Sequence, residues 1–303
     1  MVYLQHFGLQ DYPFRLTPDT RYAFDHPGHR EALNVVLVAL DAGEGFIKVT
    51  GEVGTGKTLL CRRLLALLEE RAVTAYLPNP HVNPNGLRLA LAEELGLQCP
   101  RNLGQHRVMQ LLRERLLELA ADERPVVFII DEAQAMPGET LEALRLISNL
   151  ETEQRKLVHL VLLGQPELDQ RLAGRKLRQL RQRISFSHQL QPLDVADVAN
   201  YLRFRLQQAG HDGAPLFSRA AVRHLARSSR GVPRLVNILA HKALLVAFGK
   251  GASRVEAKHV LRAVADTDDA RAPDTLPWLG IALGGLLVLS TAAGAVLASG
   301  ALG

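Results

Sequence analysis

The stretch from residue 46 to residue 70 constrains this 303-residue chain more than any other part of its sequence. A short apolar run, FIKVT, leads into GEVGTGKT at residues 51–58 and then into the leucine-rich segment LLCRRLLALLEE. This order predicts a strand, a glycine-rich loop and a helix. Such a loop curls backbone N–H groups around a phosphate, and the N-terminus of the helix adds its dipole. The sequence therefore predicts an α/β fold with a phosphate-binding loop.

The loop matches the pattern GxxxxGK[ST] in full. In this motif the lysine, here Lys57, reaches the β- and γ-phosphates, and the hydroxyl of Thr58 is a ligand of Mg²⁺. We therefore expect ATP and Mg²⁺ as cofactors. The predicted nucleotide-binding residues are Gly51, Glu52, Val53, Gly54, Thr55, Gly56, Lys57, Thr58 and Leu59.

Two adjacent acids follow a run of apolar residues, VVFII, at residues 126–130. At the end of a buried strand, Asp131 can hold Mg²⁺ and Glu132 can polarise the attacking water. The two acids can instead cap the helix that follows. Because they accompany a phosphate-binding loop, we prefer the catalytic interpretation. It predicts that the protein hydrolyses ATP, and not only that bound ATP holds the protein in a closed conformation.

A polar residue, Gln165, follows the predicted strand LVHLVLL at residues 157–163. Its side chain can lie between Glu132 and the γ-phosphate, where it would orient water and report whether the phosphate is present. It can equally be a simple turn residue before Pro166. The sequence leaves both interpretations open.

Several arginines can stabilise the charge that phosphoryl transfer spreads onto oxygen. Arg178, Arg181 and Arg183 precede the last predicted strand, at residues 184–190, and one of them can reach the ATP of a neighbouring subunit. Most arginine runs are instead solvated helix faces. Arg234 lies in the first turn of a helix that is predicted to begin at Pro233 in GVPRLVN, and it can point into the nucleotide cleft. The alternative for Arg234 is a surface ion pair.

The pattern of predicted secondary structure changes at about residue 191. Before this point, strand-like runs alternate with helical segments, which is typical of a parallel sheet covered on both faces. After it, residues 195–265 show only helical periodicity, interrupted by glycine and proline. We therefore predict an N-terminal segment at 1–27, a P-loop α/β core at 28–191, an α-helical lid at 192–265, a linker at 266–276 and a transmembrane helix at 277–299.

The predicted transmembrane helix rests on the absence of charged side chains after Asp274. A helix needs about 20 apolar residues to cross the hydrocarbon core. Trp278 lies where indoles prefer the interface. A buried core helix is the alternative. Gly280 and Gly284 form a GxxxG pattern, which either joins two helices or arises by chance in a glycine-rich span.

The overall composition indicates a globular protein but does not name a partner. The 36 Lys and Arg exceed the 31 Asp and Glu by a net charge of +5, which is scattered along the chain, so we do not expect nucleic acid as a partner. Cys61 and Cys99 form no metal-binding or disulfide pattern, which is typical of a reducing compartment. The N-terminus lacks the pattern of a secretory signal peptide.

The motifs together resemble those of the AAA+ ATPases. The P-loop, IIDEAQ, GQPEL, the arginine-rich turn and GVPRLVN occur in that family's order. FGLQDYPFRLTPDT and HREALNVVLVAL resemble the N-terminal signature of the general secretion pathway protein A (ExeA-like) group. YLPNP, NLGQHR and EALRLISNLE resemble its branch from mannose-sensitive haemagglutinin (MSHA) pilus biogenesis, the MshM-like proteins. The resemblance covers about residues 3–268.

The resemblance implies roles for four residues. It gives the sensor-1 role to Gln165, the sensor-2 role to Arg234 and the finger acting on a neighbouring subunit to Arg183, with Arg178 as the second choice. It also implies a homo-oligomer with pilus or secretion assembly proteins as partners in the bacterial inner membrane, linked to an outer-membrane secretin. The secretion-pathway members carry a periplasmic peptidoglycan-binding domain after the span. This chain stops there, so the resemblance does not imply direct contact with the cell wall.

Our leading hypothesis is a single-pass protein of the bacterial inner membrane with its ATPase domain in the cytoplasm. It would hydrolyse Mg·ATP in an oligomer to support a type IV (MSHA-like) pilus or a type II secretion-like apparatus. One alternative is a DNA-dependent AAA+ ATPase of the transposition-helper type, which would need a clustered basic surface. Another is a nucleotide-gated scaffold that binds ATP without turnover.

Overall fold

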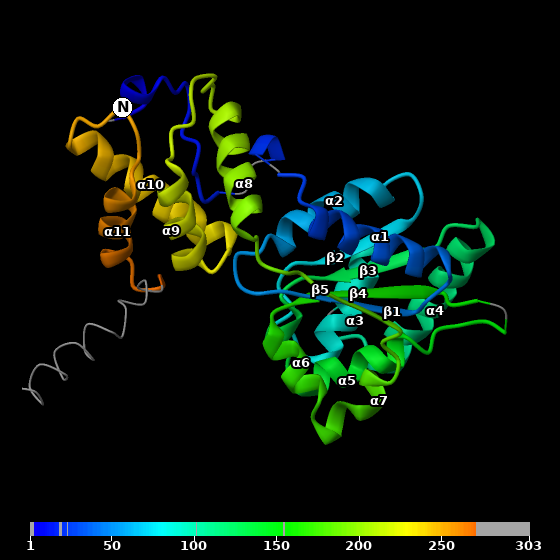
Figure 1. The fold of residues 1–303 in the computed structure, drawn as a ribbon. Helices are drawn as coiled ribbons and strands as arrows, with labels where there is room; N and C mark the ends of the chain where they lie inside the picture. Colours follow the sequence, from blue (N-terminus) through cyan, green and yellow to red (C-terminus); the bar gives the residue numbers. More distant parts are fainter. Residues whose placement is uncertain (1–2, 18–19, 23, 101, 154, 271–303) are drawn as a thin grey trace, which may run out of the picture.

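The computed structural model describes residues 3–17, 20–22, 24–100, 102–153 and 155–270. Figure 1 shows two parts, a sheet flanked by helices and a group of helices beside it. The sheet order is β2-β3-β4-β1-β5, and all neighbouring strands are parallel. The strands are β1 (Phe46–Thr50), β2 (Val73–Leu77), β3 (Val126–Ile130), β4 (Val158–Gly164) and β5 (Phe186–Gln189). The predicted α/β fold with a parallel sheet is confirmed.

The strand order places the functional motifs side by side. β4 lies between β1 and β3, with Thr50 paired to Gly164 and Ile130 paired to Leu162. Because parallel strands end at the same edge, the segments that follow β1, β3 and β4 meet there. Open parallel sheets bind ligands outside the carboxyl ends of their strands, where the strand order reverses.

Helices cover both faces of the sheet. Successive strand residues point to opposite faces, so Phe128 and Ile130 join one hydrophobic cluster while Val127 and Ile129 join another. α1 and α2 cover one face, and α3, α4 and α5 pack against the other (Figure 1). These helices and the two short ones that follow are α1 (Pro27–Asp41), α2 (Lys57–Leu68), α3 (Pro84–Glu94), α4 (Gln105–Ala121), α5 (Gly138–Ile147), α6 (Pro166–Leu172) and α7 (Arg178–Arg181).

The second part is a helical bundle that also holds the N-terminal segment. It contains α8 (Val195–Gln208), α9 (Arg219–Ser229), α10 (Pro233–Gly249) and α11 (Ala257–Ala265). Tyr3, Phe7 and Phe14 are buried in the same cluster as these helices. The hydroxyl of Tyr3 lies 2.8 Å from Nδ1 of His241. The N-terminal segment therefore packs against α10 of the bundle (Figure 1).

A polar contact joins the bundle to the sheet. Nδ1 of His26 accepts a hydrogen bond from the backbone N–H of Gly28 and so caps α1. The other ring nitrogen of His26, Nε2, lies 3.0 Å from Oδ2 of Asp197 in the first turn of α8. The imidazole thus links the first helix of the sheet part to the first helix of the bundle.

The predicted localisation, a single-pass protein of the bacterial inner membrane with its ATPase domain in the cytoplasm, is wrong. No helix in the described part of the chain is long and apolar enough to cross a membrane. The two longest, α4 and α10, have 17 residues each, whereas a span needs about 20. The helix predicted at residues 277–299, including Gly280 and Gly284, lies outside the described residues.

Candidate nucleotide site

The phosphate loop connects β1 to α2, and its backbone requires glycine at two positions. Gly54 and Gly56 have φ angles of 83° and 97°. These values lie in the left-handed region, which residues other than glycine rarely adopt. A Cβ on Gly54 would lie 2.5 Å from Cβ of Arg234, and one on Gly56 would lie 2.8 Å from Cε1 of His29. The loop is therefore closely covered by the bundle on one side and by α1 on the other.

Lys57 is the first residue of α2 and is buried beneath the loop. Its Nζ donates to the carbonyl oxygens of Gly51 at 2.8 Å and of Glu52 at 3.1 Å. Burial lowers the pKa of Lys57, while the nearby carboxylates of Glu132 and Asp131 raise it. These acceptors and acids hold the ammonium group inside the curve of the loop.

Thr58 and Asp131 form the second half of the site. Oγ1 of Thr58 donates to Oδ2 of Asp131 at 3.2 Å. Asp131 is 3% exposed, and burial raises its pKa, whereas hydrogen bonds from the Glu132 backbone and from Thr58 lower it. A hydroxyl beside a carboxylate provides two oxygen ligands suited to Mg²⁺. This ion takes one or two ligands from the protein and completes its coordination shell with water and phosphate.

The two oxygen ligands from Thr58 and Asp131 suit Mg²⁺ better than they suit a metal ion that takes all of its ligands from the protein. Among the described residues, no group of three or more His, Cys, Asp or Glu side chains is placed to hold a metal ion. A Mg²⁺ ion at this place would be held by Thr58 and Asp131, and the nucleotide would supply further oxygen ligands.

Glu132 follows Asp131 in a strained backbone conformation, with φ of 52°, in the left-handed region. Its Oε2 accepts hydrogen bonds from Nε2 of Gln134 and, at 3.1 Å, from Nε2 of Gln165. The backbone N–H of Gln165 in turn donates to Oε1 of Gln134 at 2.9 Å. Two side-chain amides therefore orient the candidate base.

Gln134 is a site residue that the sequence analysis missed. It lies in the quoted motif DEAQ, but its role depends on the short 3-10 helix at Ala133–Ala135. This turn brings the Gln134 side chain back toward Glu132 and toward the end of β4. Only a polar residue two positions after the base could have signalled this contact in the sequence.

Arg234 lies directly on the phosphate loop. Pro233 is the first residue of α10, and the backbone N–H of Arg234 donates to the carbonyl of Gly54 at 3.3 Å. The Arg234 side chain is exposed and forms no ion pair with any described residue. The structure thus brings the predicted sensor-2 residue to the cleft.

A cavity of about 410 Å³ opens beside the loop, between the sheet part and the bundle. It lies within the range of small-molecule sites. Tyr22 is 4% exposed, and its buried hydroxyl has no hydrogen-bond partner among the described residues. The sequence analysis missed this aromatic and polar wall because it combines distant segments. Its main residues are Tyr22, His29, Tyr201, Arg205 and Asn237.

His29 connects α1 to the phosphate loop. Its Nε2 lies 2.8 Å from the carbonyl oxygen of Thr55. Burial lowers the pKa of His29, which the bond to Thr55 partly opposes. The neutral ring with a proton on Nε2 therefore donates to the loop and closes the site on the side of α1.

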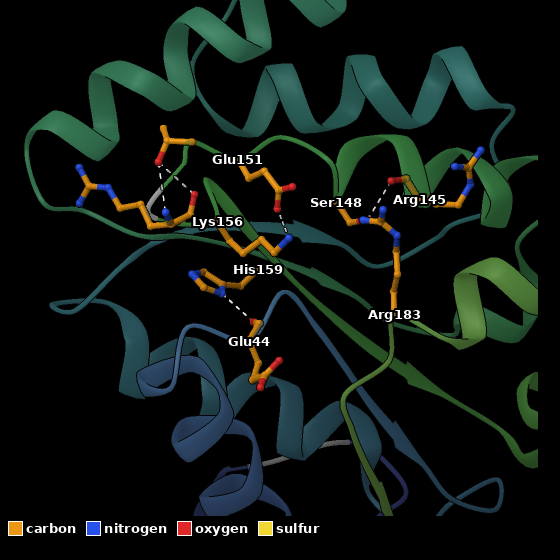
Figure 2. Close-up of polar contacts among 9 residues, drawn as sticks. Glu44, Arg145, Ser148, Glu151, Lys156, His159 and Arg183 are labelled. Atoms are coloured by element: carbon orange, nitrogen blue, oxygen red, sulfur yellow. Dashed lines mark hydrogen bonds and ion pairs between the residues drawn. The ribbon is translucent and has the colours of Figure 1, made fainter.

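Arg183 lies far from this cavity, at the amino end of the strands. Its neighbour Ser185 donates its backbone N–H to the carbonyl of Phe46, the first residue of β1. Figure 2 shows the Arg183 side chain beside the end of α5, where Nη1 donates to Oγ of Ser148 at 3.0 Å. Arg178 and Arg181 are exposed on α7. None of the three arginines lines the cavity of its own chain.

The phosphate loop, the paired acids after β3, the strand order and the helical bundle define a P-loop ATPase of the AAA+ class. Residues 40–172 match the AAA domain family. The chain is 40% identical over 294 residues, or 96% of its length, to the General secretion pathway protein A of Aeromonas hydrophila. It belongs to the AAA+ group that includes this protein. The chain spans 53% of that relative.

Solved structures support the same fold. Cdc6p from Pyrobaculum aerophilum has a TM-score of 0.62 and 17% identity, with 82% of this chain and 71% of that chain covered. The Orc1 protein of Aeropyrum pernix, solved in complex with DNA, has a TM-score of 0.58 and 23% identity, with 84% and 69% covered. Identities this low show the fold alone.

Proposed function

We propose that this chain hydrolyses Mg·ATP between the subunits of a homo-oligomer and uses the cycle to help build a secretion or type IV pilus apparatus. The observation that carries the proposal is the cluster of Lys57, Thr58, Asp131 and Glu132 around one loop, with the base oriented by two amides. Each residue type and position suits phosphoryl transfer.

The proposed chemistry assigns one task to each side chain. Lys57 binds the β- and γ-phosphates, and Thr58 and Asp131 would hold a Mg²⁺ ion, which would supply positive charge to neutralise the phosphates. Glu132 accepts a proton from water, a role that contributes roughly 10²–10⁴-fold in rate. Gln165 contacts the same carboxylate and can couple the position of that carboxylate to the presence of the γ-phosphate.

The proposal requires a neighbouring subunit. Arg183 lies at the amino end of the strands and the P-loop lies at the carboxyl end, so Arg183 cannot reach the ATP of its own chain. A finger supplied by a neighbour is worth roughly 10³–10⁵ in turnover. Arg234 lies in the first turn of α10 and contacts the loop, so binding of ATP there can move the bundle relative to the sheet.

The proposed partners are pilus or secretion assembly proteins, with an outer-membrane secretin as the structure they serve. The support is the 40% identity to a General secretion pathway protein. The narrower assignment to an MSHA-like pilus rests on the motif resemblance alone. Because the chain spans 53% of this relative, its partners have to be established on the chain itself.

The decisive experiment compares the full chain with Glu132→Gln. We expect the variant to bind ATP with unchanged affinity and to lose at least about a hundredfold in turnover. Undiminished turnover would refute the assignment of the base. Absent turnover in the unaltered chain, together with normal ATP affinity, would favour the nucleotide-gated scaffold. Strong stimulation by duplex DNA that falls steeply with salt would favour the DNA-dependent alternative.

A further inference from the structure

A second cavity lies in the helical bundle, between α8, α9 and the loop at residues 210–218. Its volume is about 850 Å³. No residue lines both this cavity and the one beside the phosphate loop. α8 and α9 pack side by side in the bundle (Figure 1), so the groove between them belongs to a single structural unit.

The floor of the groove is apolar. Leu202 and Leu206 of α8 and Leu216 and Phe217 of the loop lie at its base, and each is no more than 5% exposed. At its mouth, Val195 is 46% exposed. A concave apolar surface with an exposed aliphatic residue at its edge is typical of a place where side chains of a ligand are buried.

The rim of the groove is basic. Arg203, Arg219, Arg223 and Arg254 line it, and all four are exposed. None of them forms an ion pair with a residue in the described part of the chain. Asp212 is the one acid among the described residues that line the groove. The guanidinium groups are therefore available to carboxylates from outside.

The N-terminus of α9 strengthens this positive field. Ser218 caps the helix by accepting a hydrogen bond from the backbone N–H of Ala221 at 3.2 Å. Arg219 and Arg223 extend from the first two turns of α9 and line the groove. The positive end of a helix dipole favours anionic groups nearby.

We propose that this groove binds an acidic amphipathic segment of a partner protein. Apolar side chains of the segment enter the cavity, and its carboxylates pair with the four arginines, whose planar guanidinium groups match carboxylates in bidentate geometry. This is the helix-in-groove mode of recognition. The apolar floor favours a peptide over a nucleic acid, since phosphate contacts need a basic surface but no such cavity. The proposal does not depend on ATP hydrolysis.

The test measures binding of a designed probe to the full chain by fluorescence anisotropy, without nucleotide. The probe is a labelled 16-residue helical peptide with Leu at positions i, i+3, i+4 and i+7 and Glu at the flanking positions. Its matched control carries Gln in place of every Glu. We expect the Glu peptide to bind at least tenfold more tightly than the Gln peptide and to lose affinity as salt increases.

Variants locate the binding. The double variant Arg203→Glu/Arg223→Glu should weaken the Glu peptide at least tenfold, and so should Val195→Asp at the apolar edge. Arg227→Glu is the matched control, because Arg227 is exposed on α9 but does not line the groove. Unchanged ATP turnover in all three variants would show that they fold.

Several results would overturn the proposal. These are absent binding of the Glu peptide, equal binding of the two peptides, or equal binding by the Arg203→Glu/Arg223→Glu and unaltered chains. Tighter binding of a duplex DNA oligonucleotide that this double variant abolishes would assign the groove to nucleic acid instead. Self-association lost in the same variant would assign it to a second copy of the chain.

Discussion

Nε2 of Gln165 donates a hydrogen bond to Oε2 of Glu132 across 3.1 Å, although 33 positions separate the two residues in the chain. The bond exists because β3 and β4 are neighbours and end at the same edge of the sheet. Gln134 donates to the same oxygen. The carboxylate is thus held by a residue from the end of each strand, and any group that displaces either amide changes its orientation.

The first prediction concerns Gln134→Ala. This variant removes a hydrogen bond to the carboxylate of Glu132 and another to the backbone of Gln165. Hydrogen bonds to charged groups contribute about 1.5–3 kcal/mol, so we expect kcat for ATP to fall by roughly 10–100-fold, with little change in KM. Gln182→Ala, an exposed residue after α7, is the control. Equal kcat values for the two variants would show that Gln134 does not position the base.

The second prediction tests the role of Arg183 between subunits. Arg183→Ala and Glu132→Gln should each be inactive alone, and an equal mixture of the two should recover about a quarter of the activity, since one interface in four then joins an intact base to an intact finger. Steady-state ATP turnover after mixing is the measurement.

The neighbouring arginines serve as controls for this experiment. Arg178→Ala and Arg181→Ala should retain most of the turnover, because both side chains are exposed on α7 and neither shares the Arg183 contact with Ser148. A mixture that stays inactive would argue against a finger at Arg183. A larger loss in Arg178→Ala than in Arg183→Ala would transfer the role to Arg178.

The third prediction concerns Gly54→Ala. The new Cβ would lie 2.5 Å from Cβ of Arg234, on a backbone with φ of 83°, so either the loop or the start of α10 has to move. We expect the Kd for ATP, measured by titration calorimetry, to rise at least about tenfold. Gly249→Ala is the control, because a Cβ there meets no atom within 4 Å. Equal ATP affinity in both variants would show that the contact between bundle and loop is not needed for binding.

The fourth prediction is a pH dependence of stability that includes His29. Burial lowers the pKa of His29, as it does for His241 and His259. A lowered pKa means that the unfolded chain binds protons more readily than the folded one. The stability from the neutral ring is therefore fully present above the unfolded pKa of about 6.5 and is lost as the pH falls toward the folded value.

Urea unfolding at pH 7.5 and pH 5.5 measures this effect. The free energy of unfolding of the unaltered chain should be lower at pH 5.5, and His29→Gln, which keeps a donor for the carbonyl of Thr55, should show a smaller difference between the two values. His188→Gln is the control, since His188 is partly exposed on the edge strand β5. An equal pH effect in His29→Gln and in the unaltered chain would contradict the prediction.

Local patterns of the sequence predicted the sheet part well. β3 matches the predicted run at 126–130, because a strand buried on both faces is apolar throughout. The last strand, predicted at 184–190, is shorter and occupies residues 186–189. Polar residues alternate along this edge strand, so the apolar pattern of the sequence predicts the bounds of β5 less precisely than those of β3. The predicted inner-membrane localisation was wrong, because no helix among the described residues is long and apolar enough to cross a membrane. That prediction depended on the apolar composition of residues outside the described part of the chain.

The sequence by itself determined which residues form the phosphate-binding loop and the pair of acids that accompanies it. Lys57, Thr58, Asp131 and Glu132 are identified by spacing, because a strand, a glycine turn and a helix N-terminus are local structures. Only the tertiary structure decided that Gln134 donates a hydrogen bond to Glu132, the candidate base, that Tyr22 and His29 line the cavity and that Arg183 lies away from it. Those relations depend on strand order, on the turn after β3 and on packing between segments that are not adjacent in the chain, which the spacing of a motif does not encode.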